Sequence, residues 1–182
     1  MGIFINDKMS KLDFNDLINH ITPMEDFRLK WRFNVEKYDI LPDEHLDELK
    51  PLDASASEFL WNFISNTGLH TNFPFKRDFF RTIDNIKINS INNHDIKKWL
   101  YQRALPFDKP VYLSWQPSDA MIVPWKLFIK YFDSFYYSVS DDLTIIDHSL
   151  NWALFFHHDN EIYFGTNDKF IPSKTFDNID IE

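Results

Sequence analysis

The feature that most limits the fold of this chain is a series of strand-like segments near its C-terminal end. Four segments rich in β-branched and aromatic residues, separated by turn residues, lie at 135–139, 143–147, 151–157 and 161–166. The pair Asp159-Asn160 fits a two-residue hairpin turn between the last two. Residues 152–156, Trp-Ala-Leu-Phe-Phe, are apolar on both faces, which predicts a central strand. Residues 133–166 are therefore expected to form an antiparallel meander of three to four strands.

The first 132 residues are dominated by helical patterns. Apolar residues recur at helical spacing, and capping or breaking residues flank them, in the segments 11–21, 42–50, 55–67, 79–83, 92–105 and after Pro124. Ser10 or Asp13 is placed to cap the first of these helices. Two added strands are expected near 27–35, where apolar residues alternate with basic ones, and at 111–115.

Helical segments that precede an antiparallel sheet indicate an α+β fold. The expected architecture is a single domain over residues 1–182, with N-terminal, mainly helical segments packed on the C-terminal sheet. No internal repeat and no linker of low complexity divides the chain, and residues 167–182 read as an acidic tail.

Charge is distributed unevenly along the chain. Residues 133–182 contain ten Asp or Glu against two Lys, whereas residues 1–132 contain eighteen acids against seventeen bases. Nearly all of the net charge of −9 therefore belongs to the last 50 residues. Such a surface suits a basic protein partner and disfavours nucleic acid and anionic membranes.

Several common classes of site have no signature in this sequence. Without cysteine there are no disulfides, thiolate zinc sites or cysteine nucleophiles. The three glycines are too far apart to form a phosphate-binding loop, and neither Gly-x-Ser-x-Gly nor His-Glu-x-x-His occurs. No secretory signal and no membrane-length apolar run is present. We therefore expect a soluble cytoplasmic protein, and the sequence identifies no catalytic residue, metal ligand set or cofactor.

The residues expected to contact a partner are acidic and aromatic. The acidic candidates lie in or between the C-terminal strands and share one sign of charge, and the aromatic candidates flank a Pro-containing loop or lie in the last strand. They are Asp141, Asp142, Asp147, Asp159 and Glu161, with Trp115, Trp125 and Tyr163. By contrast, Trp61, Trp99 and Trp152 are assigned to the core.

A second hypothesis concerns the histidines of the same region. A small metal-dependent hydrolase could use His148 or His157 with Asp142 or Asp147. Adjacent residues of a strand point to opposite faces, so His157 and His158 are not expected to share one ion. At most one histidine, with carboxylates from a neighbouring strand, is expected to converge on such a site.

Four stretches, 111–115 (Val-Tyr-Leu-Ser-Trp), 142–147, 152–158 (Trp-Ala-Leu-Phe-Phe-His-His) and 162–165 (Ile-Tyr-Phe-Gly), carry a resemblance to known domains. This run resembles small bacterial domains of unknown function and immunity proteins of polymorphic toxin and contact-dependent growth inhibition systems. The resemblance implies a cytoplasmic immunity protein that neutralises a cognate, basic, nuclease-type toxin domain through an acidic surface. The sequence leaves open the identity of the toxin, the stoichiometry and the oligomeric state.

Overall fold

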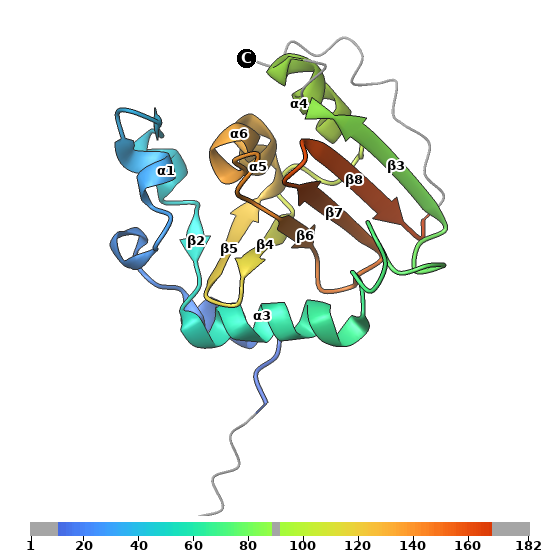
Figure 1. Cartoon of the computed structure of the whole chain (residues 1–182). Coiled ribbons are helices and arrows are strands. Elements are labelled where there is room, and N and C mark those ends of the chain that lie inside the picture. Colours follow the sequence, from blue (N-terminus) through green and yellow to red (C-terminus); the bar gives the residue numbers. More distant parts are fainter. Residues whose placement is uncertain (1–10, 89–91, 169–182) are drawn as a thin grey trace, which may run out of the picture.

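The computed structural model describes residues 11–88 and 92–168. In these residues seven strands form one antiparallel sheet in the order β2-β5-β4-β6-β7-β8-β3 (Figure 1). The strands are β2 (Lys50–Pro51), β3 (Thr82–Lys87), β4 (Pro110–Gln116), β5 (Asp119–Pro124), β6 (Leu143–Ile146), β7 (Trp152–His157) and β8 (Glu161–Thr166). The helices lie mostly earlier in the chain, so the α+β prediction is confirmed.

The meander β6-β7-β8 matches three of the four predicted C-terminal strands. Residues 152–156 of β7 are buried on both faces, and β7 lies inside the sheet next to its middle strand, β6. Thr144 pairs with Phe155, which in turn pairs with Tyr163. Because paired residues point to the same side of a sheet, these three side chains share one face.

A hairpin of β4 and β5 extends the meander on one side. The predicted strand at 111–115 is confirmed within β4, and the next strand along the chain is β5. Its residues pair with β4 from Asp119 to Pro124, and α5 (Trp125–Lys130) begins directly afterwards. Pro124 fits both roles, because it ends a strand as readily as it precedes a first helical turn.

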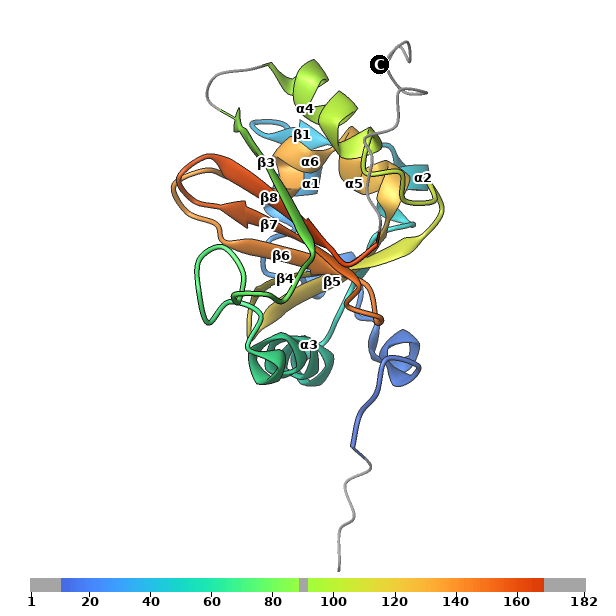
Figure 2. The ribbon, with the colours of Figure 1, turned by 90° about the vertical axis from the view of Figure 1, so that its right-hand side faces the viewer.

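Helices cover both faces of the sheet (Figure 2). One face is covered by α1 (Trp31–Asn34), α2 (Asp43–Leu46), α4 (Asn93–Tyr101), α5 and α6 (Phe132–Phe135), and we call it the closed face. The other is covered by α3 (Ala54–Thr67) and by η1 (Asp16–His20), and we call it the open face. A short 3-10 turn, η2 (Met24–Asp26), and the two-residue strand β1 (Asp39–Ile40) complete the elements.

Side chains cap the N-terminal ends of the two longest helices, α3 at Asp53 and α4 at Asn92, where the sequence had placed the cap at Asn93. The Asp53 side chain accepts a hydrogen bond from Ala56 N at 2.9 Å at the start of α3, and Gly68 ends that helix in a left-handed conformation with φ of 68°. The Asn92 side chain caps α4 by accepting from Asp95 N at 2.9 Å. The helices predicted at 55–67 and 92–105 are thus confirmed, the second ending at Tyr101.

The strand predicted near 27–35 is wrong. The chain makes a turn and then the single helical turn of α1, which buries Leu29, Arg32 and Phe33 together. That spacing is helical, and Arg32, which the alternation placed on the outer face, points into the protein. Its burial alongside Asp141 overrides the period of two in the sequence.

Three further predictions differ from the structure because strand pairing and side-chain bonding decide them. Residues 79–83 were expected to be helical, but β3 pairs with β8 at the edge of the sheet. Residues 135–139 were expected to be a strand, but α6 and a turn occupy them, because Asp141 accepts a hydrogen bond from Tyr137 N at 2.8 Å and folds the chain back. Residues 42–50 form the shorter α2, after which Lys50 and Pro51 join the sheet as β2.

The helix predicted at 11–21 is only a 3-10 turn over Asp16–His20. Asp13 closes this turn by accepting from Asn15 N at 2.7 Å, and Ser10 lies outside the described residues. Leu17 is buried there, but Ile18 is exposed. Most of the predicted acidic tail, residues 169–182, also lies outside the described residues.

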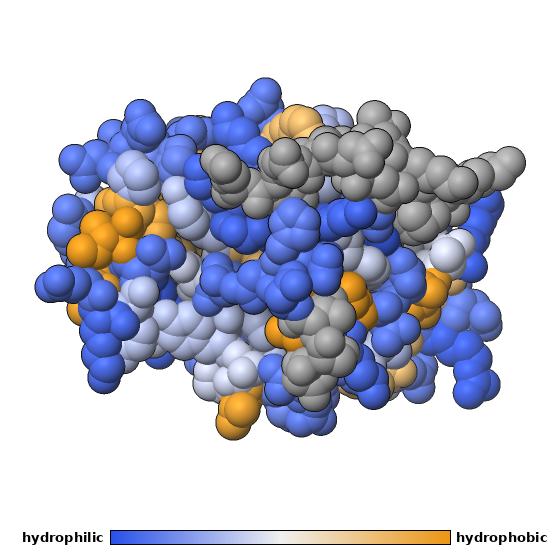
Figure 3. Space-filling model, turned by 90° about the horizontal axis from the view of Figure 1, so that it is seen from above, coloured by the Kyte–Doolittle hydropathy of each residue, from blue (hydrophilic) through white to orange (hydrophobic). Residues whose placement is uncertain are grey.

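Apolar side chains pack against both faces of the sheet. At Gly165 of β8 this packing is especially tight. A Cβ atom at Gly165 would collide with the ring of Phe80, which packs directly on the strand. The outer surface seen from above is mostly hydrophilic with scattered apolar groups (Figure 3), so the helices there turn their apolar sides towards the sheet. Within the described residues, no helix has the length and hydropathy that a membrane span needs.

Candidate functional site

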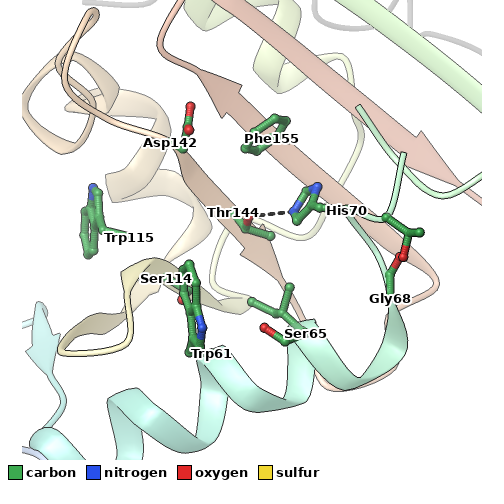
Figure 4. Close-up of a pocket in the computed structure, with 11 residues that line it drawn as sticks. Trp61, Ser65, Gly68, His70, Ser114, Trp115, Asp142, Thr144 and Phe155 are labelled. Carbon is green, nitrogen blue, oxygen red and sulfur yellow. Dashed lines mark hydrogen bonds between the residues drawn. The ribbon is translucent and has the colours of Figure 1, made fainter. Parts of the chain in front are cut away.

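The open face contains a recess of about 440 Å³ between α3, the loop that follows it and the strands β4, β6 and β7 (Figure 4). Trp61, Trp115 and Phe155 form aromatic walls, and Ser114 and Thr144 lie on the strands beneath. Ser114 and Thr144 are partners across β4 and β6. Because both are small, the sheet surface between the larger side chains remains hollow.

His70 ties the loop after α3 to the sheet at one side of the recess. Its Nδ1 lies 2.8 Å from the carbonyl oxygen of Pro74, and its Nε2 lies 2.9 Å from Oγ1 of Thr144. A carbonyl oxygen only accepts, so Nδ1 carries the proton and the threonine hydroxyl donates to Nε2. Burial lowers the pKa of His70, which outweighs the opposing effects of the Pro74 carbonyl and of Asp142. The ring is therefore neutral at pH 7 and holds the loop in place.

The two hydroxyl groups of the recess differ in their bonding. Thr144 is bonded to His70, whereas the Ser114 hydroxyl is buried and has no hydrogen-bond partner among the described residues. An unpartnered buried hydroxyl is costly in a folded protein. Ser114 is therefore a polar group whose bonding capacity is unused in the free protein.

Asp142 brings charge to the recess and also joins a second cluster at its rim. Among the described residues that line the recess, Asp142 is the only one with a formal charge, given that His70 is neutral. Its Oδ1 lies 2.9 Å from Nδ1 of His158 and accepts from His158 N at 3.0 Å. The hydrogen bond to Asp142 raises the pKa of His158, and the nearby charges of Asp142 and Asp159 add to this.

His157 completes the rim cluster, contrary to the expectation that adjacent strand histidines diverge. The rings of His157 and His158 lie with centroids 4.0 Å apart and an interplanar angle of 41°, and ligand-type atoms of both and of Asp142 lie within 4.8 Å of one another. The alternation rule fails here because β7 ends at His157 and the chain turns at His158, where Asp142 bonds both its backbone and its ring.

An exposed aromatic residue stands above this rim. Phe73, whose exposed fraction is 60%, meets the His157 ring edge-on at a centroid distance of 4.8 Å and the Tyr163 ring at 5.3 Å. The Tyr163 hydroxyl donates to Glu161, and burial together with this bond raises the pKa of Tyr163 to about 12. The candidate anchor Tyr163 is thus half-buried and part of the aromatic group beside the recess.

Two of the five acidic candidates are buried rather than exposed. Asp141, 8% exposed, accepts from Nη1 and Nη2 of Arg32 at 2.5 and 3.0 Å. Asp147, 3% exposed, accepts from Trp152 Nε1 at 3.0 Å and pairs with Lys109 Nζ at 2.8 Å. The prediction that they are free charge contacts is wrong, because cations from the first 130 residues reach them inside the fold.

The remaining three acidic candidates differ in exposure and in their partners. Glu161 is half-buried and lies 3.5 Å from Lys87 Nζ, while Asp142 and Asp159 are exposed beside the histidines. The acidic residues therefore do not form one broad exposed face within the described residues. The exposed negative charge that remains is that of Asp142 and Asp159, at the rim of the recess.

The exposure of the tryptophans also differs from the prediction. Trp125 is fully buried and Trp115 is 5% exposed, with its Nε1 donating to Phe135 O at 2.9 Å. They were expected at the surface, but α5 and the closed-face core take up Trp125, and a shift of register in β4 places Trp115 between that core and the recess. Trp61, which was assigned to the core, is 37% exposed at the recess.

Sequence reasoning missed His70, Thr144 and Ser114. Thr144 and Ser114 are polar residues inside apolar strands, and that interruption was the available signal. His70 lies in an irregular loop, where no local pattern distinguishes it. Of the residues in the hydrolase hypothesis, only His157 and Asp142 come together, since His148 lies beside Phe14 and Asp147 is committed to Lys109 and Trp152.

Comparison with protein families gives one match. The model of the family described as "Protein of unknown function (DUF2947)" matches residues 21–165, from before α1 to the penultimate residue of β8. Comparison with the curated proteins finds no significant match, and neither does comparison with the solved structures.

Proposed function

Because this chain belongs to DUF2947, a family of unknown function, we propose from its site that it is a binding protein that receives a cationic side chain of a basic partner in the open-face recess. The partner class that we propose is a toxin domain, so that the chain acts as an immunity protein. The observation that carries this proposal is an aromatic-walled recess with a single carboxylate, Asp142.

The recess has the size and chemistry for an arginine or lysine side chain. Its volume of about 440 Å³ lies within the range of about 300–1,000 Å³ that is usual for ligand sites. Trp61, Trp115 and Phe155 offer ring surfaces to a cation, and Asp142 offers a charged acceptor. The Ser114 hydroxyl, buried and without a hydrogen-bond partner among the described residues, lies on the strand beneath the recess. Together these groups would replace the water that a cation loses on entry.

The charge of the chain and the form of the rim support a protein partner. A net charge of −9 attracts a basic protein over long distances and speeds encounter. Phe73 and Trp61 are exposed aromatics of the kind that become buried anchors in interfaces. The resemblance of residues 111–165 to immunity proteins is the reason to propose a toxin as this partner. Asp142 and Asp159 then take the role that was predicted for five acidic residues.

A small cationic probe tests the recess directly. We would titrate Nα-acetyl-arginine amide into the protein in the presence of EDTA and follow tryptophan fluorescence, because Trp61 and Trp115 line the site. A dissociation constant of about 1 mM, or roughly −4 kcal/mol, is expected for such a fragment. Asp142→Asn should weaken binding about tenfold or more, because it removes the charged acceptor.

Asp133→Asn is the matched control for this titration. Asp133 is exposed and bonded to Asn93 on α4, and it does not line the recess, so the same change of charge is made elsewhere. Its effect should be less than twofold. Equal weakening by the two variants would show that only net charge matters, and the absence of saturable binding by the wild type would contradict the proposal.

The biological test uses the protein encoded by the gene immediately upstream, which for an immunity protein is the toxin. Cells that express this neighbour should grow only when the chain is co-expressed. Asp142→Asn and Trp61→Ala should abolish protection, and Asp133→Asn should retain it. A neighbour that is harmless alone, or full protection by the recess variants, would refute the assignment as an immunity protein that acts through the recess.

A further inference from the structure

At the rim of the recess, Asp142 meets two histidines, His157 and His158, that have no role in the proposed contact with a cationic side chain. Each of Asp142, His157 and His158 offers a ligand atom, and these three atoms lie within 4.8 Å of one another. Two imidazoles with one carboxylate form a ligand set that zinc and other divalent transition metals bind. Exposed surface acids alone would not give this selectivity.

The separations allow one ion to bind all three side chains. Bonds of 2.0–2.1 Å to a tetrahedral metal place ligand atoms about 3.4 Å apart, so a separation of 4.8 Å must close by about 1.4 Å. Asp142 and His158 are about half-exposed, with side-chain exposures of 51% and 45%, and can rotate into position. Oδ1 of Asp142 and Nδ1 of His158 are already 2.9 Å apart.

The third ligand is held by its surroundings. The His157 ring, whose side chain is 15% exposed, lies against Phe73 and Phe155 at centroid distances of 4.8 and 5.7 Å. The Tyr136 hydroxyl donates to the His157 carbonyl at 2.5 Å, which fixes the backbone where β7 ends. His157 is therefore positioned before any ion arrives.

Asp159 provides an outer partner for both rings. Its carboxylate oxygens lie 3.8 Å from Nδ1 of His157 and 3.8 Å from Nε2 of His158. Metal-binding histidines commonly direct their second nitrogen to a carboxylate, which orients the ring. Asp159 lies in the hairpin turn that follows directly, so the inner and outer partners come from one short segment and from Asp142.

We propose that Asp142, His157 and His158 form a binding site for a divalent transition metal ion of the zinc class. Three protein ligands leave at least one coordination position open. Asp142 belongs to both the metal cluster and the recess, so the ion would sit at the recess mouth. This site is a property of the free protein and does not depend on the proposed partner.

Metal titration of the free protein tests this proposal. Untagged protein is stripped with a chelator and titrated with Co²⁺, followed by its d–d absorption, and with Zn²⁺ by calorimetry. One equivalent should bind with a dissociation constant of about 10 µM or tighter. His157→Gln, His158→Gln and Asp142→Asn should each weaken binding about tenfold or more, since even outer partners contribute that much.

His148→Gln is the matched control, because His148 is an exposed histidine beside Phe14, outside the cluster. It should bind metal as the wild type does. Thermal unfolding of each apo variant verifies the fold, and the exposed position of His158 makes His158→Gln informative even if His157→Gln unfolds. Wild-type binding weaker than about 1 mM, or an equal loss in His148→Gln, overturns the site. The arginine titration in EDTA is independent, so either proposal can fail alone.

Discussion

The two faces of the sheet treat polar groups in different ways. On the closed face five helices cover the strands, and the buried charges of Arg32 and Asp141 pair with each other, although Nε of Arg32 and Nε1 of Trp125 have no hydrogen-bond partner among the described residues. On the open face one long helix and a loop cover the strands less completely. There the Ser114 hydroxyl has no partner, and a recess is left beside it.

This difference follows from the free energy of burial. A buried ion that loses its partner cannot return to water, so the closed face tolerates charge only as complete pairs. On the open face Ser114 and Thr144 are buried as well, but the carboxylate of Asp142 is exposed at the rim of the recess and can exchange bonds with a ligand. We therefore expect stability to depend on the polar groups of the closed face and binding to depend on those of the open face.

The largest effect should come from breaking the buried pair of the closed face. Arg32→Ala leaves Asp141 charged and buried, and should lower the free energy of unfolding by about 3–5 kcal/mol, measured by urea denaturation. Arg32 also stacks over the Tyr137 ring at 4.5 Å, so packing is lost as well. Lys37→Ala, an exposed cation on the same part of the chain, should change stability by less than about 0.5 kcal/mol.

The double variant Arg32→Met with Asp141→Leu sharpens this result. Replacing both charges by apolar side chains removes the stranded carboxylate and should recover part of the loss. Recovery will be incomplete, because Asp141 also accepts from Tyr137 N. A loss below about 1 kcal/mol in Arg32→Ala would contradict the distinction between the faces.

A pH-dependent effect is expected at Asp147, whose bonds reach into the closed face. Burial alone would raise the pKa of Asp147, but Lys109, Ser149 and Trp152 together lower it below its usual 3.8. A lowered pKa in the folded state gives stability that is present above the unfolded value and is lost as the pH falls through the folded value. Asp147→Asn should therefore cost roughly 1–3 kcal/mol at pH 7 and much less near pH 3.

Urea denaturation of the wild type and of Asp147→Asn at the two pH values measures this difference. Asp133→Asn, at an exposed acid, serves as the control for general charge effects. An equal cost at pH 7 and pH 3 would show that the carboxylate charge is not what stabilises the turn after β6.

Gly165→Ala tests whether the open face is loose everywhere or only at the recess. The new Cβ would collide with the Phe80 ring, so we expect a loss of about 1–3 kcal/mol in the free energy of unfolding. The same substitution in a Phe80→Leu background should cost less, because the two sites share one contact. A neutral Gly165→Ala would indicate that the whole open face can adjust.

The smallest effect is expected from the paired hydroxyls of the recess. Thr144→Val removes the donor to His70 and should cost about 1 kcal/mol, and faster amide exchange at Lys76, whose N–H bonds Leu69 O, would report loosening of the loop. Ser114→Ala removes a hydroxyl that has no partner among the described residues and should be neutral or slightly stabilising. Equal effects of the two variants would remove the distinction between them.

Much of the fold was predictable where one local signal acted alone. Residues 152–156 were recognised as an inner strand because they are apolar on both faces, and α3 because its apolar residues keep helical spacing up to Gly68. The site was far less predictable. Two of its three metal-type ligands, His157 and His158, were expected to point apart, and the turn that joins them to Asp142 depends on bonds from another strand.

The errors share a physical cause. At 27–35 and at the acids Asp141 and Asp147, the sequence pattern assumes that charged residues face water. Cations distant in the sequence, Arg32 and Lys109, neutralise these acids inside the fold. Strand pairing with β8 likewise determined that 82–87 is a strand.

By itself the sequence determined the order of helices and strands in outline, the buried character of β7, the end of α3 at Gly68 and the net charge, because each depends on neighbours along the chain. Only the tertiary structure decided which carboxylates stay exposed, which tryptophans reach the surface, and where a recess and a histidine cluster form. Those features depend on which side chain, far away in the sequence, pairs with a charge or fills a space in the fold. A local sequence pattern does not identify that partner.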